Sequence, residues 1–174
     1  SSLRPQTLTI EAWIKADGAG TVVGAGGYEL RVDAARNVIF GVNIGGAITP
    51  QLTAGMLEWG QWTHIVASYD GAELRAFVNT VPKGSLSRPG AIAYPPSPAD
   101  TIRIGCSAAS SGCLRGSIGE VRIYPEAWTS PPRITRLRTE YETSVSGPSF
   151  GLPLRVWNYG DIATGDDDFY EELS

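Results

Sequence analysis

Hydrophobic and polar side chains alternate along much of the chain, and residues 61–71 show the pattern most clearly. The apolar positions of this stretch are Ile65, Ala67 and Tyr69. Their period of two is typical of a strand that buries one face, and the dipeptide Asp70-Gly71 that follows favours a hairpin turn. We therefore predict a strand with one face in a core, with His64 on the opposite face, and with a tight turn at its end.

Further segments repeat this alternation and are predicted to be strands. They are residues 8–15, 21–23, 28–32, 38–43, 73–79, 102–104 and 117–124. Residues 45–60 are predicted to be a loop whose apolar side chains pack down over the sheets. Residues 85–100 are rich in proline, which cannot donate a backbone hydrogen bond, so we predict an extended surface loop here and not a central strand.

The C-terminal part of the chain is predicted to contain one short helix, one edge strand and an acidic tail. A hydroxyl cap at Thr129, a proline in the first turn and apolar residues at helical spacing up to Tyr141 predict the helix. Residues 152–157 are predicted to be a last strand, which its proline confines to a sheet edge. We place one domain over residues 1–160 and a solvated acidic tail over residues 161–174.

The composition of the chain agrees with an all-β fold. Among its 174 residues there are 21 Gly and 12 Pro, and only 18% are charged. Many short strands joined by turns need such a composition, whereas long amphipathic helices do not. A single β-sandwich domain is the architecture that this length and composition favour.

The distribution of charge argues against nucleic acid as a partner. All six acidic residues after Gly160 stand in a segment without Lys or Arg, so they account for the net charge of -4 and leave the remainder nearly neutral. Binding to phosphates needs clustered basic side chains, which this chain does not offer. No apolar run approaches the length of about 20 residues that a membrane span needs, so we expect no membrane insertion.

The only two cysteines, Cys106 and Cys113, flank a loop of Ser, Ala and Gly between two predicted strands. Such a loop turns the chain back and can bring the two sulfur atoms together, so we predict a disulfide and hence an oxidising compartment. Two reduced thiols at the end of a hairpin are the alternative. A zinc site is disfavoured because His64 is the only histidine.

Six of these segments occur in the order and spacing of one known family. They are residues 9–15, 28–32, 61–71, 74–79, 102–105 and 116–124, the last reading Gly-Ser-Ile-Gly-Glu-Val-Arg-Ile-Tyr. Over residues 7–137 the chain resembles the laminin-G-like branch of the concanavalin A-like lectin and glucanase superfamily. The resemblance implies a two-sheet antiparallel jelly-roll sandwich, to which we add the short C-terminal helix. It also implies a non-catalytic module of a secreted or surface protein, which binds glycans or other proteins and in many relatives calcium.

Two departures from the family pattern bear on these expectations. Relatives usually carry an Asp, described as a calcium ligand, just before the Glu-Val-Arg-Ile-Tyr segment, where this chain has Gly119. Because Gly119 removes an oxygen donor, we expect no cofactor and no bound metal, and calcium is the one ion that the family still suggests. Relatives also begin with a strand upstream of residue 8, and we expect residues 152–157 to fill that edge.

Side chains on the strand faces opposite the core define a candidate binding site. They are Trp13, Glu11, His64, Arg75, Phe77, Glu120, Arg122 and Tyr124. If their strands lie in one sheet, aromatic rings stand among hydrogen-bonding groups, an arrangement that can stack on a sugar ring and bind its hydroxyls. Alternatively, loops such as residues 45–60 cover this face, and Glu11, His64 and Glu120 form an internal polar network.

No set of residues in the sequence indicates an enzyme. Glu11 and Glu120 could reach the carboxylate separations of glycosidases, but the Glu-x-Asp-x-x-Glu pattern of the glucanases and a second histidine are absent from the sequence. We predict a non-catalytic, extracellular carbohydrate-binding or adhesion module within a larger secreted or surface protein, with a glycan or an extracellular protein as its partner. A protein-interaction or structural module without a glycan ligand is the alternative, and a polysaccharide hydrolase or lyase is less favoured.

Overall fold

The computed structural model of the protein describes residues 4–96, 101–107 and 112–130, together with the backbone of three strands nearer the C-terminus. The chain divides into two compact units, Ser1–Pro131 and Pro132–Ser174. The predicted domain boundary after residue 160 falls within the second unit.

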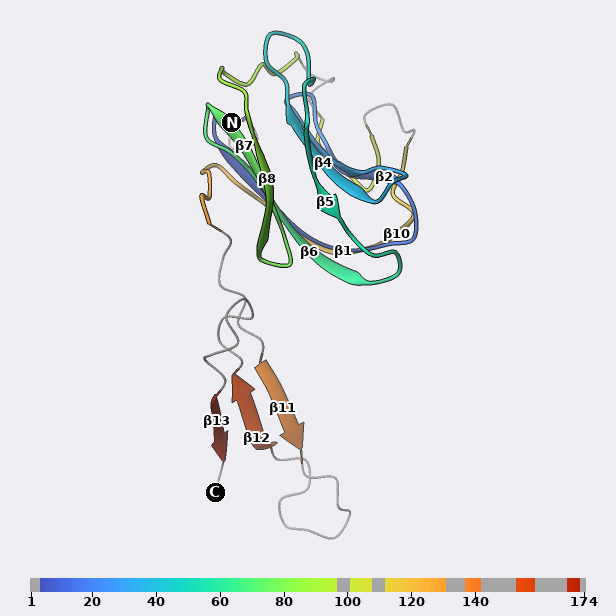
Figure 1. The fold of residues 1–174 in the computed structure, drawn as a ribbon, viewed down its shortest axis with the longest axis vertical. Coiled ribbons are helices and arrows are strands. Elements are labelled where there is room, and N and C mark those ends of the chain that lie inside the picture. The colour runs from blue at the N-terminus through green and yellow to red at the C-terminus, as the bar shows by residue number, and fades with distance from the viewer. Residues whose placement is uncertain are drawn as a thin grey trace. The chain divides into compact units, whose positions relative to one another are not determined.

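The first unit contains two antiparallel sheets of five strands each (Figure 1). Sheet A has the strand order β10-β1-β6-β7-β8, and sheet B has the order β5-β4-β3-β2-β9. The strands of sheet A are β1 (Leu8–Ala16), β6 (Trp62–Tyr69), β7 (Glu73–Val78), β8 (Val81–Ser87) and β10 (Gly116–Tyr124). The strands of sheet B are β2 (Gly20–Gly24), β3 (Tyr28–Val32), β4 (Asn37–Val42), β5 (Leu52–Met56) and β9 (Arg103–Ile104). The predicted two-sheet antiparallel sandwich is confirmed.

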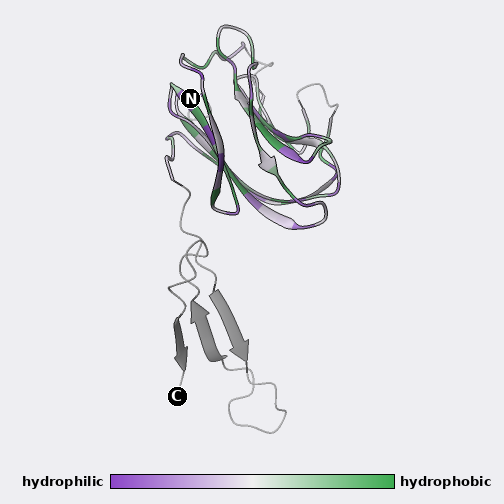
Figure 2. Cartoon of the chain, in the orientation of Figure 1, coloured by the Kyte–Doolittle hydropathy of each residue, from purple (hydrophilic) through white to green (hydrophobic). Residues whose placement is uncertain are grey.

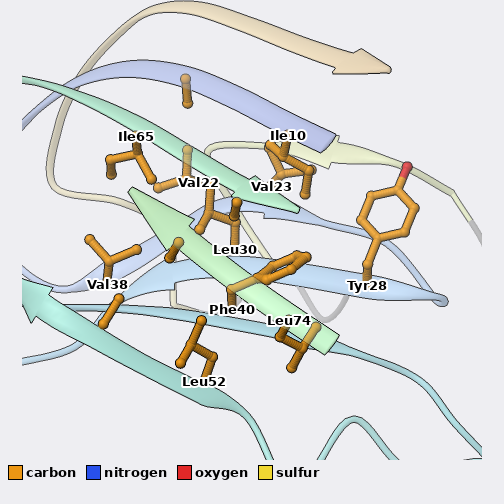
Figure 3. Close-up of a cluster of buried hydrophobic side chains, with 14 of the residues drawn as sticks. Ile10, Val22, Val23, Tyr28, Leu30, Val38, Phe40, Leu52, Ile65 and Leu74 are labelled. Atoms are coloured by element: carbon orange, nitrogen blue, oxygen red, sulfur yellow. The ribbon is translucent and has the colours of Figure 1, made fainter. Parts of the chain in front are cut away.

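The inner faces of sheets A and B enclose one hydrophobic core (Figure 3). Hydrophobic and hydrophilic stretches are interspersed along the strands of both sheets, as the colours in Figure 2 show. The core side chains of β1 and β6 are completely buried: Leu8, Ile10, Ala12, Ile14, Ile65, Ala67 and Tyr69. Burial of a large aliphatic side chain contributes about 1.5–3 kcal/mol to the stability of the fold. The alternating apolar positions therefore decide which face of β1 and of β6 points toward the core.

Two edge strands, β5 and β8, were not predicted from the sequence, and only residues 85–87 of β8 overlap the predicted loop of residues 85–100. Strand β5 falls within the predicted loop of residues 45–60, and its alternation is limited to two buried residues, Leu52 and Ala54. Strand β8 is exposed at almost every position and contains Pro82, so it carries no buried face that a sequence pattern could reveal. Proline is tolerated in β8 because it is an edge strand of sheet A.

Three strands of the second unit form a separate antiparallel sheet with the order β11-β12-β13. They are β11 (Leu137–Tyr141), β12 (Pro153–Asn158) and β13 (Phe169–Glu172). The predicted helix start at Thr129 and Ser130 is not helical, residues 131–136 lie outside the described residues, and the predicted end of the helix is β11, which pairs with β12. Strand β12 was expected to complete an edge of the sandwich, but its backbone pairs with β11 and β13.

The hairpin between β6 and β7 is built around Asp70, as the sequence predicts. One carboxylate oxygen of Asp70 accepts the backbone N–H groups of Ala72 and Glu73, at 2.9 and 2.8 Å, and the other accepts Arg75 Nη1 at 2.7 Å. Gly71 has a φ of 95°, in the region that favours glycine. The turn is therefore fixed by side-chain hydrogen bonds as well as by backbone conformation.

A disulfide joins Cys106 to Cys113, which confirms the predicted pairing. It ties the end of β9 to the segment that leads into β10. A backbone hydrogen bond lies beside the disulfide, from the N–H of Leu114 to the carbonyl of Gly105. In the described ranges, no helix has the length and apolar character that a membrane span requires.

We expect the hairpin at Asp70 to make stability depend on pH. Burial alone would raise the pKa of Asp70, but the hydrogen bonds from Arg75 and the turn N–H groups outweigh it and lower the pKa to about 2. This stabilisation is present above the ordinary pKa near 3.8 and is lost as the pH falls through about 2. Asp70→Asn should therefore cost about 1 kcal/mol at neutral pH, because the partly exposed pair is screened.

Urea unfolding at a series of pH values measures this effect. The deficit of the Asp70→Asn variant relative to the unmodified chain should shrink between about pH 4 and pH 2. Glu58→Gln is the control, because the exposed Glu58 pairs with Arg36 at the surface and takes no part in the hairpin. A deficit for Asp70→Asn that stays constant down to the lowest pH would contradict the assignment.

Candidate functional site

The register of sheet A brings most of the predicted site residues onto its outer face. Strand β1 lies between β10 and β6, so that Trp13 stands opposite both Glu120 and His64. Two pairs further along, and on the same face, Glu11 stands opposite Arg122. The condition on which the predicted site depended, that these strands share one sheet, is met.

Glu11 is the centre of a hydrogen-bond network on this face. Its carboxylate lies 2.9 Å from His64 Nε2, accepts the hydroxyl of Tyr124 at 3.0 Å, and lies 3.6 Å from Arg122 Nη1. The Glu11 side chain is only 13% exposed, and a carboxylate so far removed from water needs hydrogen-bond donors around it. Three residues from two neighbouring strands therefore hold Glu11 in one position.

His64 takes part in this network as a donor and not as a surface group. Its side chain is 1% exposed, and because a carboxylate can only accept, the proton between His64 and Glu11 lies on Nε2. The other ring nitrogen, Nδ1, is buried and has no hydrogen-bond partner within the described ranges. The alternative interpretation placed Glu11, His64 and Glu120 in an internal polar network; Glu11 and His64 are joined in this way, whereas Glu120 is 46% exposed and lies at the surface.

Arg122 and Glu120 carry the network to the surface. Arg122 is 54% exposed, and its Nη2 lies 2.6 Å from Oε1 of Glu120, which is similarly exposed. Hydrogen bonding to Tyr124 and the charge of Glu120 raise the pKa of Arg122. Burial and the hydrogen bond to Glu11 raise the pKa of Tyr124. The hydroxyl of Tyr124 therefore stays protonated and donates a hydrogen bond to Glu11.

Aromatic rings surround these polar groups. The rings of Trp13 and His64 lie 4.9 Å apart between centroids, and those of Tyr124 and Trp128 lie 4.4 Å apart. Trp62, at the start of β6, is 51% exposed. The outer face of sheet A thus presents indole and phenol rings next to a charged pair.

A β-bulge at Gly119 shapes the surface beside Trp62. In β10, Glu120 pairs with Trp13 and Ile118 pairs with Ile14, so Gly119 has no opposite residue. A Cβ atom at Gly119 would lie 3.1 Å from Cζ3 of Trp62 and 3.8 Å from Cβ of Trp13. The absence of a side chain at Gly119 is therefore what lets the Trp62 ring lie against β10.

Residues 125–130 cover the other end of this face. Thr9 donates its hydroxyl to the carbonyl of Glu126 at 2.7 Å and accepts the N–H of Trp128 at 2.9 Å. Ser68 donates to the carbonyl of Trp128 at 2.7 Å. These bonds explain why Thr9 and Ser68 are completely buried although they point away from the core. The expected cover, residues 45–60, contributes β5 to sheet B instead.

Two predicted site residues stand apart from the network around Glu11. Arg75 forms ion pairs with Asp70 and Glu73 in the hairpin, at 2.7 and 2.5 Å. Phe77 is 5% exposed, so little of its ring is accessible to a ligand. A binding role for Arg75 or Phe77 stays a prediction.

The residues around Gly119 do not fit a calcium site. Glycine offers no side-chain oxygen, and the space that a side chain would enter is taken by Trp62. Within the described residues, no group of three or more His, Cys, Asp or Glu side chains could hold a metal ion. We therefore assign no chemistry to calcium at this position.

Sequence reasoning did not include Trp62 and Trp128 in the site. Trp62 is two residues before His64, so extending the strand by one alternation would have placed it on the same face. Trp128 follows the end of β10 in an irregular segment, and no periodicity predicts where its ring lies. Its contact with Tyr124 depends on the hydrogen bonds that hold residues 125–130 to the sheet.

The model of the family described as the concanavalin A-like lectin/glucanases superfamily matches residues 1–131. No curated protein sequence matches the chain. Several solved structures share its fold, at sequence identities that support a likeness in fold alone.

Three of these structures illustrate the likeness. A pentraxin from Limulus polyphemus superposes with a TM-score of 0.54 at 17% identity, covering 72% of this chain and 66% of the pentraxin, so the chain spans just under two thirds of that relative. The Ruminococcus gnavus IT-sialidase CBM40 bound to sialyllactose has a TM-score of 0.60 at 15% identity, covering 73% and 80%. Domain 4 of the arabinanase AbnA from Geobacillus stearothermophilus, in complex with arabinotriose, has a TM-score of 0.55 at 20% identity, covering 72% and 63%.

We expect Glu11→Gln to destabilise the first unit. The amide keeps the shape of the side chain but replaces an acceptor oxygen with a donor, so one of the donors from His64 and Tyr124 is left buried and unpaired. Such a loss costs about 1–3 kcal/mol. Urea unfolding measures the free energy, and Glu120→Gln is the matched control, which should change it by less than about 0.5 kcal/mol because Glu120 is exposed. Equal losses for both variants would contradict a central role for Glu11.

Proposed function

The chain belongs to the concanavalin A-like lectin/glucanases superfamily, and we propose that it is a carbohydrate-binding module that holds sugar on the outer face of sheet A. The observation that carries the proposal is the half-exposed ring of Trp62, which lies against Gly119 and beside Trp13. An aromatic face can stack on the C–H groups of a sugar ring. The exposed pair of Arg122 and Glu120 stands close by and can bind sugar hydroxyls.

The ligands of similar folds support this assignment. The structures of the CBM40 and of domain 4 of AbnA contain sialyllactose and arabinotriose. At 15% and 20% identity these proteins are similar to the chain in fold alone, so they support the class of ligand and not its identity.

The proposed module is non-catalytic. Glycosidases need two carboxyl groups at about 5–9.5 Å that are free to exchange protons or attack the sugar. Here the Glu11 carboxylate is engaged by His64 and Tyr124, and Arg122 lies close enough to pair with both Glu11 and Glu120. His64 is too deeply buried to reach a bound sugar. The network around Glu11 is better suited to hold a binding face rigid than to carry out chemistry.

We place the module outside the cell, as part of a secreted or surface protein. The disulfide between Cys106 and Cys113 supports this location, because such bonds persist in oxidising compartments. We also propose that sugar binding does not require calcium, since Gly119 and Trp62 occupy the position where a calcium ligand would stand.

A glycan array of the full chain, run with and without a chelator, tests the proposal. We expect binding that the chelator does not change and that Trp62→Ala weakens about tenfold or more. The control is Ile104→Ala, which removes an equally exposed hydrophobic side chain from β9 in sheet B and should leave binding unchanged. A flat array together with stable co-purification of a partner protein would favour a protein-interaction module instead.

A further inference from the structure

A hollow of about 470 Å³ opens at one end of the sandwich, next to the start of β6. It lies between the end of β5 in sheet B and the ends of β7 and β8 in sheet A, and its lining includes Met56, Trp62, Asn79, Val81 and Lys83. Its volume falls in the range of small-molecule binding sites, about 300–1,000 Å³. The hollow is therefore large enough for a sugar unit.

Exposed hydrophobic side chains gather at this hollow. Within the described residues, the large hydrophobic side chains that are exposed are Met56, Trp62, Val81 and Ile104, at 57%, 51%, 48% and 58%. All except Ile104 line the hollow. Single exposed hydrophobic residues are ordinary, but a cluster of them around a hollow marks a binding site.

Unused hydrogen-bonding groups stand among these hydrophobic side chains. The oxygen of the Asn79 side chain accepts the backbone N–H of His64 at 2.9 Å, which fixes the amide. Asn79 Nδ2, the side-chain amide of Gln61 and the ammonium group of Lys83 have no partner in the described part of the chain. Apolar surface with oriented donors is the combination that binds a sugar ring and its hydroxyls.

The hollow is continuous with the proposed binding face through Trp62. The ring of Trp62 reaches Gly119 in β10, and the same residue lines the hollow. Together the binding face and the hollow form a strip that runs from Gly119 in β10 past Trp62 to Asn79 and Val81. The strand register supports this path, because Asn79 follows Val78, which stands opposite both Ile65 in β6 and Val81 in β8. Strands in a sheet lie about 4.8 Å apart, so a strip that crosses from β10 to β7 spans about 14 Å. This length exceeds that of one sugar ring.

The charges along the strip nearly cancel. Glu120 pairs with Arg122 at one end, and Glu58 pairs with Arg36 at 2.8 Å near the other. Lys83 adds one positive charge at the hollow, Lys15 adds another opposite Trp62, and Glu11 adds one negative charge beneath the face. No cluster of one sign is present along the described strip to attract a highly charged ligand.

We propose that the protein binds a neutral oligosaccharide chain lengthwise, with one part stacked on Trp13 and Trp62 and another part in the hollow beside Val81 and Lys83. This inference rests on the proposed carbohydrate-binding function and extends its site from the face of sheet A to the end of the sandwich. Recognition of a chain along its length differs from recognition of a single terminal sugar.

Titration calorimetry of the full chain with oligosaccharide ladders tests the inference. The probes are the cello-, xylo- and arabino-oligosaccharides from the disaccharide to the hexasaccharide. For at least one ladder, we expect affinity to rise with chain length by about tenfold or more. The double variant Val81→Ala/Lys83→Ala should remove this gain and leave disaccharide binding unchanged. Trp62→Ala should weaken binding of both short and long probes.

The controls separate this inference from the proposed function. Ile104→Ala should change neither short nor long probes, and melting curves check that each exposed substitution leaves the fold intact. If Trp62→Ala weakens binding while the double variant binds the hexasaccharide normally, the extended site is wrong and the proposed function stands. Binding of charged glycans on the array without binding of any neutral ladder overturns the ligand class. Failure of both array and ladders overturns the proposed function as well.

Discussion

The pairing of β1 with β6 on one side and β10 on the other is the constraint on which the rest of the structure depends. Because side chains along a strand alternate between faces, one register decides both what enters the core and what meets on the outer face. It places Ile10 and Ala12 inside the sandwich and brings Glu11 to His64 and Tyr124 on the other side. Core packing and the candidate site are therefore two results of the same backbone hydrogen bonds.

The outer face of sheet A combines a structural part and an accessible part. At one end, hydrogen bonds to Thr9 and Ser68 seal residues 125–130 onto the sheet. At the other end, Trp62 and the pair of Arg122 and Glu120 remain open to solvent. The buried network around Glu11 lies between them and gives the accessible groups a rigid support, so that a ligand need not order them on binding.

The sequence predicted those features that depend on local alternation. The core residues of β1 and β6 and the shared face of Glu11, Trp13 and His64 followed from a period of two. Strands β5 and β8 were missed, since an edge strand with few buried positions has no such period. The covering of Ser68 was also beyond the sequence, because it depends on residues 125–130, an irregular segment whose position is set by contacts distant in the chain.

The bulge at Gly119 has a consequence for how this surface can change during evolution. Elsewhere in β10, losing one residue would turn the neighbouring side chains to the wrong face. Gly119 has no opposite residue in β1, so its deletion would leave Ile118 opposite Ile14 and Glu120 opposite Trp13, as they are now. The surface under Trp62 would change, while Val121 and Ile123 would keep their contacts with the core. An insertion or deletion at this one point can alter the binding face of a descendant protein without disturbing its fold.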